Sequence, residues 1–240
     1  MDNDWAWATH DDNPGFCLTF VRNRDPATVA DLLGGGPPQS MTREDATHTY
    51  PLTLPGSVLR LGAKETWSYC YEDRAPIASR KALRERLSDG TDVVQIVKSG
   101  DGMTIARRLN NGRTLEQFEP GPTAAPRGNH PAVLLELVNR VLADRPHTSR
   151  LTAALHAAGE YVGAVVTRQD LDGPLPTSYS THPTDPTTPP ATSAPAGLGR
   201  RLATMRIPGQ PGDTPPEQPT RRCCVLRSGD AFGLAMRRGQ

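Results

Sequence analysis

A change in composition near residue 176 limits what this chain of 240 residues can fold into. Twelve of its 24 prolines lie in residues 1–173, and the other twelve lie in residues 174–240. Residues 1–176 carry 19 basic and 22 acidic side chains, whereas residues 177–240 carry 8 arginines and 4 acids. A stretch such as 184–190 (TDPTTPP) buries too little apolar surface to offset the entropy that is lost on ordering. The sequence therefore predicts one domain over residues 1–176 and a disordered tail over residues 177–240, rich in proline, threonine and arginine.

Two hypotheses are open for the tail. It is either a solvated disordered segment or a read-through or frame-shifted extension that has no role. The chain has three lysines against 24 arginines, and arginine, alanine, glycine and proline all have GC-rich codons. We therefore interpret the arginine excess as a genomic bias and not as an adaptation to phosphate binding.

Charge, hydropathy and cysteine content exclude several classes of protein. The net charge of +1 argues against a protein whose role is to bind nucleic acid. No apolar run approaches the ~20 residues of a membrane span, and the acidic N-terminus lacks the basic start of a signal peptide. Four cysteines, two of them adjacent, do not make a disulfide framework. We therefore expect a cytoplasmic protein with no nucleic-acid partner and no membrane partner.

Periodicity and turn residues predict the elements of the domain. Runs of β-branched and aromatic residues predict strands at 16–21, 58–62, 65–72, 93–97, 103–109, 113–118 and 161–166. Helices are expected to start near residues that suit an N-cap or a first turn: Asp25, Ser79, Asn129 and Ser149. Asn111-Gly112 is a strong hairpin signal, and residues 37–55 have loop-like character. The pattern predicts an α+β fold, with a mostly antiparallel sheet and about four helices packed on it.

Strand 65–72 carries three aromatic side chains at a period of two. Trp67, Tyr69 and Tyr71 therefore share one face of the strand. Such a stripe most often lies in the core beneath a packed helix, which is our first interpretation. If that face were open, Trp67, Tyr69 and Tyr71 would be candidate residues for binding a partner. Stacking on nucleic-acid bases is disfavoured because the domain is net negative and no basic residues interleave with the stripe.

Acidic residues at strand ends are the candidate catalytic groups. Glu72 and Asp73 end the aromatic strand, and Glu116 and Glu119 flank the end of the second hairpin strand. Carboxylates in such positions can act as general acids and bases, but they can also simply solvate the entry to a turn. A small hydrolase or transferase that uses Glu72, Asp73 or Glu119 is therefore the alternative to a binding protein.

Other constellations of reactive residues are incomplete. The run 34–36 (GGG) lacks the Gly-Lys-Ser/Thr of a phosphate loop and ends a helix instead of opening one. No nucleophile motif is present, and free cysteines in strands are usually small buried hydrophobes. His156 and Glu160 are spaced to share a helix face, but two ligands are too few for zinc. We therefore expect neither a metal site nor a cofactor.

Several short motifs, taken in order along the chain, resemble an uncharacterised bacterial family. The motifs are 15–22 (GFCLTFVR), 67–69 (WSY) leading to Glu72-Asp73, 87–91 (LSDGT), 118–120 (FEP), 127–128 (RG), 161–167 (YVGAVVT) and 171–175 (LDGPL). The resemblance covers about residues 5–176 and points to a domain of unknown function in actinomycete-type genomes. It implies no activity, ligand or catalytic residue. Arg107-Arg108 departs from the family pattern, because it interrupts a hairpin that is otherwise aromatic or apolar.

These observations predict a non-enzymatic cytoplasmic binding domain of protein-interaction, regulatory or immunity type. The prediction rests on the lack of a complete catalytic or metal constellation, together with a compact acidic domain and an aromatic face of the sheet. An unknown protein partner is expected, and its identity is not encoded in any motif.

Overall fold

The computed structural model describes residues 5–9, 15–51, 53–73, 76–121, 127–128 and 131–181. These residues form one eight-stranded sheet in the order β2-β8-β3-β4-β1-β5-β6-β7, in which every pairing is antiparallel. The strands are β1 Phe16–Arg22, β2 Gln39–Met41, β3 Ser57–Lys64, β4 Trp67–Asp73, β5 Asp92–Lys98, β6 Thr104–Asn110, β7 Arg113–Phe118 and β8 Leu175–Ser180. The predicted α+β class with an antiparallel sheet is confirmed.

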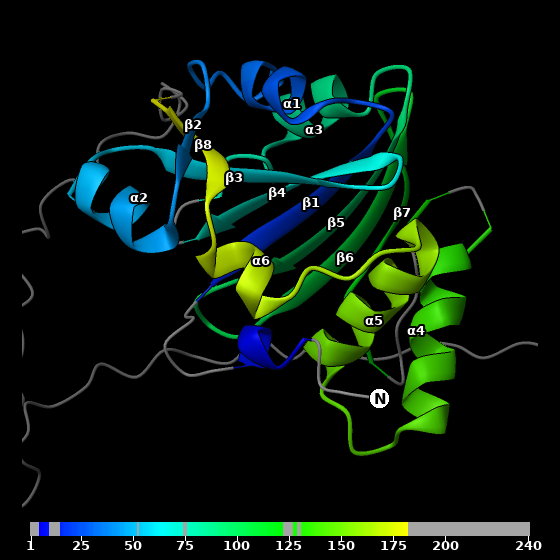
Figure 1. The fold of residues 1–240 in the computed structure, drawn as a ribbon. Helices are drawn as coiled ribbons and strands as arrows, with labels where there is room; N and C mark the ends of the chain where they lie inside the picture. Colours follow the sequence, from blue (N-terminus) through cyan, green and yellow to red (C-terminus); the bar gives the residue numbers. More distant parts are fainter. Residues whose placement is uncertain are drawn as a thin grey trace, which may run out of the picture. The chain divides into compact units, whose positions relative to one another are not determined.

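Helices cover both faces of the sheet, as Figure 1 shows. They are the 3-10 helix η1 Ala6–Thr9 and the α-helices α1 Pro26–Leu32, α2 Arg43–Thr49, α3 Lys81–Leu87, α4 Val133–Asp144, α5 Arg150–Val162 and α6 Arg168–Asp172. The first face carries α4, α5 and η1, while the second face carries α1 and α3. Among the described residues, no helix combines the length and the apolar character needed to cross a membrane.

Strand alternation separates the core into two layers. On β4, Tyr69 and Tyr71 point into the first layer, whereas the intervening Cys70 points into the second. The first layer is aromatic-rich and packs the inner sides of α4 and α5 against the sheet. The second layer is aliphatic and includes Leu83 and Leu87 of α3. Both faces of the central strands are therefore buried, which explains their nearly continuous apolar sequences.

Local sequence signals set the ends of several elements. The Asp25 side chain accepts a hydrogen bond from the Thr28 amide and caps α1, with proline at its first position. Gly163 ends α5 in the left-handed conformation that glycine adopts without strain. Asn111 and Gly112 also have positive φ and form the predicted turn between β6 and β7.

The loop expected at residues 37–55 and the strand expected at residues 161–166 both differ from the structure. Residues 37–55, expected to be a loop, contain β2 and α2, so the described residues have five α-helices of at least seven residues where about four were expected. The signal missed was the capping box in which Thr42 and Asp45 bond to each other's backbone amides. The strand expected at 161–166 does not form, because α5 continues to Val162 and Gly163 ends it.

The expected boundary at residue 176 falls inside β8. This strand pairs with β2 on one side and β3 on the other, so residues 177–180 belong to the sheet. Thr177, Ser178 and Ser180 are buried there, although their sequence has no apolar alternation. The ordered fold therefore extends at least four residues further than expected. The remainder of the predicted disordered tail, residues 182–240, lies outside the described residues.

A close approach of two strands makes Gly62 a sensitive position. Gly62 of β3 lies opposite Tyr69 of β4, and a methyl group on Gly62 would overlap the Tyr69 ring. The ring is 2% exposed, so a shift that relieved the overlap would disturb its packing in the core. We expect Gly62→Ala to lower the free energy of unfolding by about 1–3 kcal/mol, measured by urea unfolding.

Gly36→Ala is the matched control for this prediction. Gly36 is exposed, and an added methyl group would have no neighbour within 4 Å. We expect its effect to stay within about 0.5 kcal/mol. Equal losses in the two variants would contradict the overlap with Tyr69.

Candidate functional site

The aromatic stripe of β4 lies in the core. Trp67, Tyr69 and Tyr71 are 6%, 2% and 1% exposed. The Tyr71 ring meets Trp7 edge-on, with centroids 5.5 Å apart, and Trp67 meets Tyr161 in the same way at 6.2 Å. Helix α5 and η1 thus cover the stripe, and the three rings are not available as a surface for a partner.

Glu72 is fully buried and holds the segment that leads into α3. Its Oε1 accepts hydrogen bonds from Ser57 Oγ at 2.9 Å and from the Ile77 amide at 2.8 Å. Its Oε2 accepts one from the Ala78 amide at 3.2 Å. Burial raises the pKa of Glu72 to about 7, although these hydrogen bonds act in the opposite direction. The carboxyl group therefore has a structural use.

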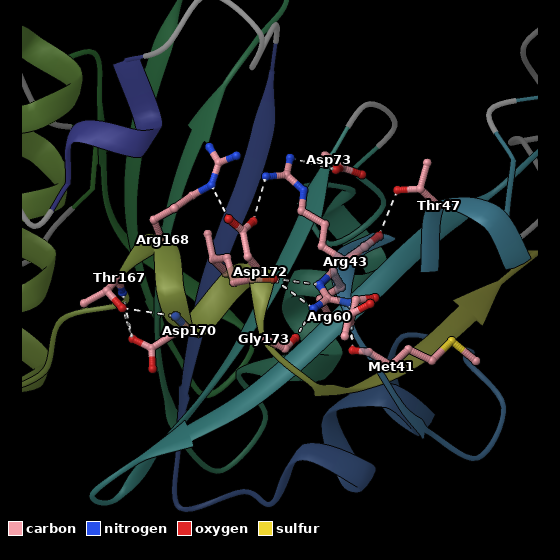
Figure 2. Close-up of polar contacts among 12 residues, drawn as sticks. Met41, Arg43, Thr47, Arg60, Asp73, Thr167, Arg168, Asp170, Asp172 and Gly173 are labelled. Atoms are coloured by element: carbon pink, nitrogen blue, oxygen red, sulfur yellow. Dashed lines mark hydrogen bonds and ion pairs between the residues drawn. The ribbon is translucent and has the colours of Figure 1, made fainter. Parts of the chain in front are cut away.

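Asp73 points to the opposite face of β4 and pairs with Arg43. Figure 2 shows the Arg43 guanidinium between Asp73 and Asp172 of α6, with N–O distances of 3.5 and 3.4 Å. The guanidinium also lies 5.9 Å from the centroid of the Tyr71 ring. Burial acts to lower the pKa of Arg43, but Tyr71, Asp73 and Asp172 outweigh it and raise the pKa above its usual value. Asp73 is therefore engaged in an ion-pair network.

Arg60 of β3 lies beneath this network and is 3% exposed. Its Nε and Nη2 donate to the Leu171 carbonyl at 3.2 and 2.8 Å, and Nη2 also donates to the Gly173 carbonyl at 2.8 Å. Its Nη1 donates to the carbonyls of Met41 and Thr42 and to the Thr177 hydroxyl. Figure 2 shows how this guanidinium joins α6 to the start of α2. Burial, followed by the charge of Arg43, lowers the pKa of Arg60.

Glu116 caps a helix from a distance. Its buried carboxylate accepts hydrogen bonds from the amides of Leu134 and Leu135, at 3.0 and 2.7 Å, in the first turn of α4. The N-cap residue of α4, Ala132, has no side-chain acceptor of its own. Arg108 Nε lies 3.5 Å from the same carboxylate. Like Glu72, Glu116 therefore has a structural role, because it accepts hydrogen bonds from backbone amides.

The structure does not bring the candidate catalytic acids together. Glu72 and Asp73 are adjacent in sequence but belong to opposite faces of the sheet. Glu119 is exposed and follows β7, which is separated from β4 by β1, β5 and β6. At a spacing of about 4.8 Å per strand, β4 and β7 lie roughly 19 Å apart. No two of Glu72, Asp73 and Glu119 share a site.

A cleft of about 440 Å³ lies between α4 and α5 on the first face. Its walls carry charged and polar side chains, namely Arg140 and Asp144 from α4, Arg145 at the C-cap of α4, and His156 and Glu160 from α5. Its apolar lining comes from Trp5, Val141, Ala164 and Val165. We refer to these residues as the α4–α5 cleft. The sequence does not indicate Arg140, Asp144 and Arg145 as site residues, because no local pattern shows which helix packs beside them.

Two polar contacts cross the α4–α5 cleft. Arg140 Nη1 lies 2.7 Å from Glu160 Oε1, and Arg145 Nη1 lies 3.3 Å from His156 Nε2. Because α5 continues past Gly159, His156 and Glu160 do share one helix face, as their spacing predicts. Within the described parts of the chain, no three His, Cys, Asp or Glu side chains gather so that they could hold a metal ion.

Comparison with known proteins yields one match. A model of a family of unknown function, DUF6461, matches residues 1–169. The chain belongs to this family. No curated protein and no solved structure matches the chain. The predicted membership of an uncharacterised family is confirmed, whereas the bacterial origin stays a prediction. The DUF6461 match ends inside α6, so β8 completes the sheet from beyond the matched residues.

Arg60 should be more important for the stability of the DUF6461 domain than Arg43. Arg60→Met leaves several buried carbonyls without a donor, each at about 1–3 kcal/mol, so we expect a loss of roughly 3 kcal/mol or more. The Arg43 side chain is 26% exposed, and we expect Arg43→Met to lose about 1 kcal/mol or less. Urea unfolding measures both, and equal losses would count against this assignment.

The free energy of unfolding of the DUF6461 domain should also depend on pH, because the buried Glu72 titrates differently in the folded and unfolded states. The pKa of Glu72 is raised from 4.5 to about 7, so the folded state keeps a proton that the unfolded state releases between these values. The contribution of Glu72 to the free energy of unfolding is largest below about pH 4.5. It falls by roughly 3 kcal/mol as the pH rises to about 7, and it is constant above that pH. We expect Glu72→Gln, which has no such proton, to lack this part of the pH dependence.

Urea unfolding at several pH values between about 4.5 and 8 tests the Glu72 prediction. Glu119→Gln, at an exposed position, is the control and should retain the wild-type profile. Superimposable profiles for the wild type and Glu72→Gln would refute the prediction.

Proposed function

We propose that the chain is a non-enzymatic protein-interaction domain, of regulatory or immunity type, that binds a segment of a partner protein in the α4–α5 cleft. The α4–α5 cleft itself carries the proposal, because it combines an apolar lining with walls that hold charges of both signs. This combination suits a peptide segment that presents an apolar side chain flanked by charged ones.

Most of the acidic side chains at the strand ends have structural partners, and this favours a binding function over catalysis. Glu72 and Glu116 accept hydrogen bonds from backbone amides, and Asp73 is paired with Arg43. A mechanism that uses two of these acids as general acid and general base needs both carboxylates to reach one substrate, and these carboxylates do not share one site. The geometry therefore supports the hydrolase or transferase alternative less well.

The charges of the α4–α5 cleft are only partly satisfied within the chain. Arg140 and Glu160 form an ion pair with each other. Asp144 has no ion pair among the described residues, and Arg145 contacts the imidazole of His156 and no carboxylate there. Two opposite charges at one end of the α4–α5 cleft are thus available to a partner. Charges placed in this way favour specificity and the rate of association.

The size of the α4–α5 cleft fits a side chain or a short peptide segment. Its volume of about 440 Å³ lies within the range of roughly 300–1,000 Å³ that is common for ligand sites. Gly159 of α5 faces Trp5, and a methyl group there would come within 3.1 Å of the indole. The small residue on α5 thus lets Trp5 lie beneath the α4–α5 cleft and supply part of its apolar lining.

The proposed location is the cytoplasm. Cys17 and Cys70 are free and buried in the second core layer, on neighbouring strands. Free thiols are usual in proteins of reducing compartments. The absence of nucleic-acid and membrane partners stays a prediction, based on the charge and hydropathy of the sequence.

Photo-crosslinking in the cells that make the protein tests the proposal. A photoreactive amino acid replaces Asp144 in the α4–α5 cleft, or Glu44 of α2 as a control at a strongly exposed position. We expect an adduct of defined mass from position 144 and none from position 44. A second substitution, Arg145→Glu, should reduce the adduct at position 144 by about fivefold or more, because it reverses an available charge.

The matched charge reversal is Arg86→Glu on α3, which should leave the adduct unchanged. Equal adducts at positions 144 and 44, or an adduct insensitive to Arg145→Glu, would contradict binding in the α4–α5 cleft. An adduct of twice the chain mass would show self-association instead of a partner protein.

A further inference from the structure

Residues 76–80 form a turn that leads into α3 on the second face of the sheet, and we refer to them as the strap. The Ser79 hydroxyl donates to the Pro76 carbonyl at 3.1 Å, and the Arg80 amide donates to the Ile77 carbonyl at 2.9 Å. Ile77 and Ala78 are buried in the second core layer. The strap therefore has its own internal hydrogen bonds and lies on the face opposite the α4–α5 cleft.

Two hydrogen bonds anchor Ala78 to the strands on either side of β1. Its amide donates to Glu72 Oε2 of β4 at 3.2 Å, and its carbonyl accepts a hydrogen bond from Gln95 Nε2 of β5 at 3.0 Å. In the sheet, Cys17 of β1 is the partner of Glu72, and Thr19 of β1 is the partner of Gln95. Ala78 therefore spans β1, and the buried Cys17 lies beneath the strap.

The two anchors of Ala78 differ in their response to pH. The Gln95 amide is neutral and is held in one orientation, because its Oε1 accepts a hydrogen bond from Arg107 Nη1 at 2.8 Å and its Nε2 also donates to Thr19 Oγ1 at 3.1 Å. Burial lowers the pKa of Arg107 to about 10, so this arginine stays protonated near neutral pH. Glu72 is consequently the anchor whose charge can change.

The charge of Glu72 is unfavourable where the strap is closed. Its carboxyl group is fully buried, and the donors that contact it are neutral, namely the Ser57 hydroxyl and the amides of Ile77 and Ala78. A carboxylate with such surroundings is less stable than a hydrated one unless its hydrogen bonds offset the loss of water. Opening of the strap lets water reach the carboxylate. Ionisation of Glu72 therefore favours the open strap, and protonation favours the closed one.

The groups around Glu72 are consistent with this direction. Burial raises the pKa of Glu72 from 4.5 to about 7 although its hydrogen bonds and the charge of Arg80 act to lower it. The other titratable groups that interact with Glu72 in the described part of the chain are Cys17 and Cys70, whose pKa values are raised by burial and then by Glu72. In an open strap the pKa of Glu72 returns towards its ordinary value, so opening releases a proton.

We propose that the strap is a pH-dependent latch, which is closed while Glu72 is protonated and opens locally, with the sheet intact, when Glu72 is ionised. Opening frees the start of α3 at Lys81 and uncovers Cys17. Segments of a protein open at free energies that range from near zero up to that of global unfolding, and a short turn with few anchors belongs to the lower part of this range.

Hydrogen exchange of the full chain, followed by NMR, tests the latch. The Ile77 and Ala78 amides are compared as protection factors, which remove the intrinsic dependence of exchange on pH. We expect their protection to be about tenfold or more below that of the Leu18 and Phe20 amides in the central strand β1, because the strap opens before the sheet does. Their protection should also fall by about tenfold or more from about pH 5.5 to about pH 8, because opening releases the proton of Glu72.

Two variants and a chemical probe complete the experiment. In Glu72→Gln, which has no such proton, strap protection should not depend on pH, whatever its level. Glu119→Gln, at an exposed position, should retain the wild-type response. In the wild type, alkylation of Cys17 by iodoacetamide is located by peptide mass spectrometry and divided by its rate in the urea-unfolded chain at the same pH. This ratio should rise by about tenfold between about pH 6 and about pH 8.

Several results would overturn the latch. Equal protection of the strap amides and the β1 amides would show that the strap opens only by global unfolding. Strap protection that is constant with pH in the wild type, or a pH response that Glu72→Gln retains, would show that Glu72 does not control the strap. A Cys17 alkylation ratio that is constant with pH would show that opening does not uncover the layer beneath the strap.

Discussion

One buried guanidinium, that of Arg60, joins the short elements at the β2 edge of the sheet. It contacts the carbonyl groups at the end of α6, those at the start of α2, and a hydroxyl group on β8. These elements have little apolar surface of their own, because α2 buries a single residue, Ala46, and α6 buries Leu171. Hydrophobic burial of about 1.5–3 kcal/mol for a large side chain is not enough to order such segments. Hydrogen bonds to Arg60 supply the missing organisation.

The same principle governs the buried acids. Glu72 gathers the amides that precede α3, and Glu116 gathers the first amides of α4, whose own N-cap residue offers no acceptor. Each carboxylate thereby satisfies backbone donors that would otherwise be buried without a partner. Acids that resemble catalytic groups in the sequence therefore have a structural role, since their carboxylates accept hydrogen bonds from the backbone. Charged side chains that lack an opposite charge among the described residues occur instead in the α4–α5 cleft, at Asp144 and Arg145.

Part of the candidate site could be predicted from the sequence. The spacing of His156 and Glu160 places them on one face of a helix, and the structure agrees. Their partners could not be predicted, because Arg145 and Arg140 come from a second helix whose packing is set by the core. Sequence periodicity describes one element at a time and does not choose its neighbour.

The sequence by itself determined the α+β class, the cap at Asp25 and the hairpin at Asn111-Gly112, since these depend on contacts within a few residues. The tertiary structure alone decided that residues 161–162 extend a helix and that β8 enters the sheet between β2 and β3. It also decided that the aromatic stripe is covered and that the acids bind amides. These outcomes depend on groups that lie far apart in the chain, such as Arg60 and Leu171, and their free energies are gained only when the whole sheet has formed.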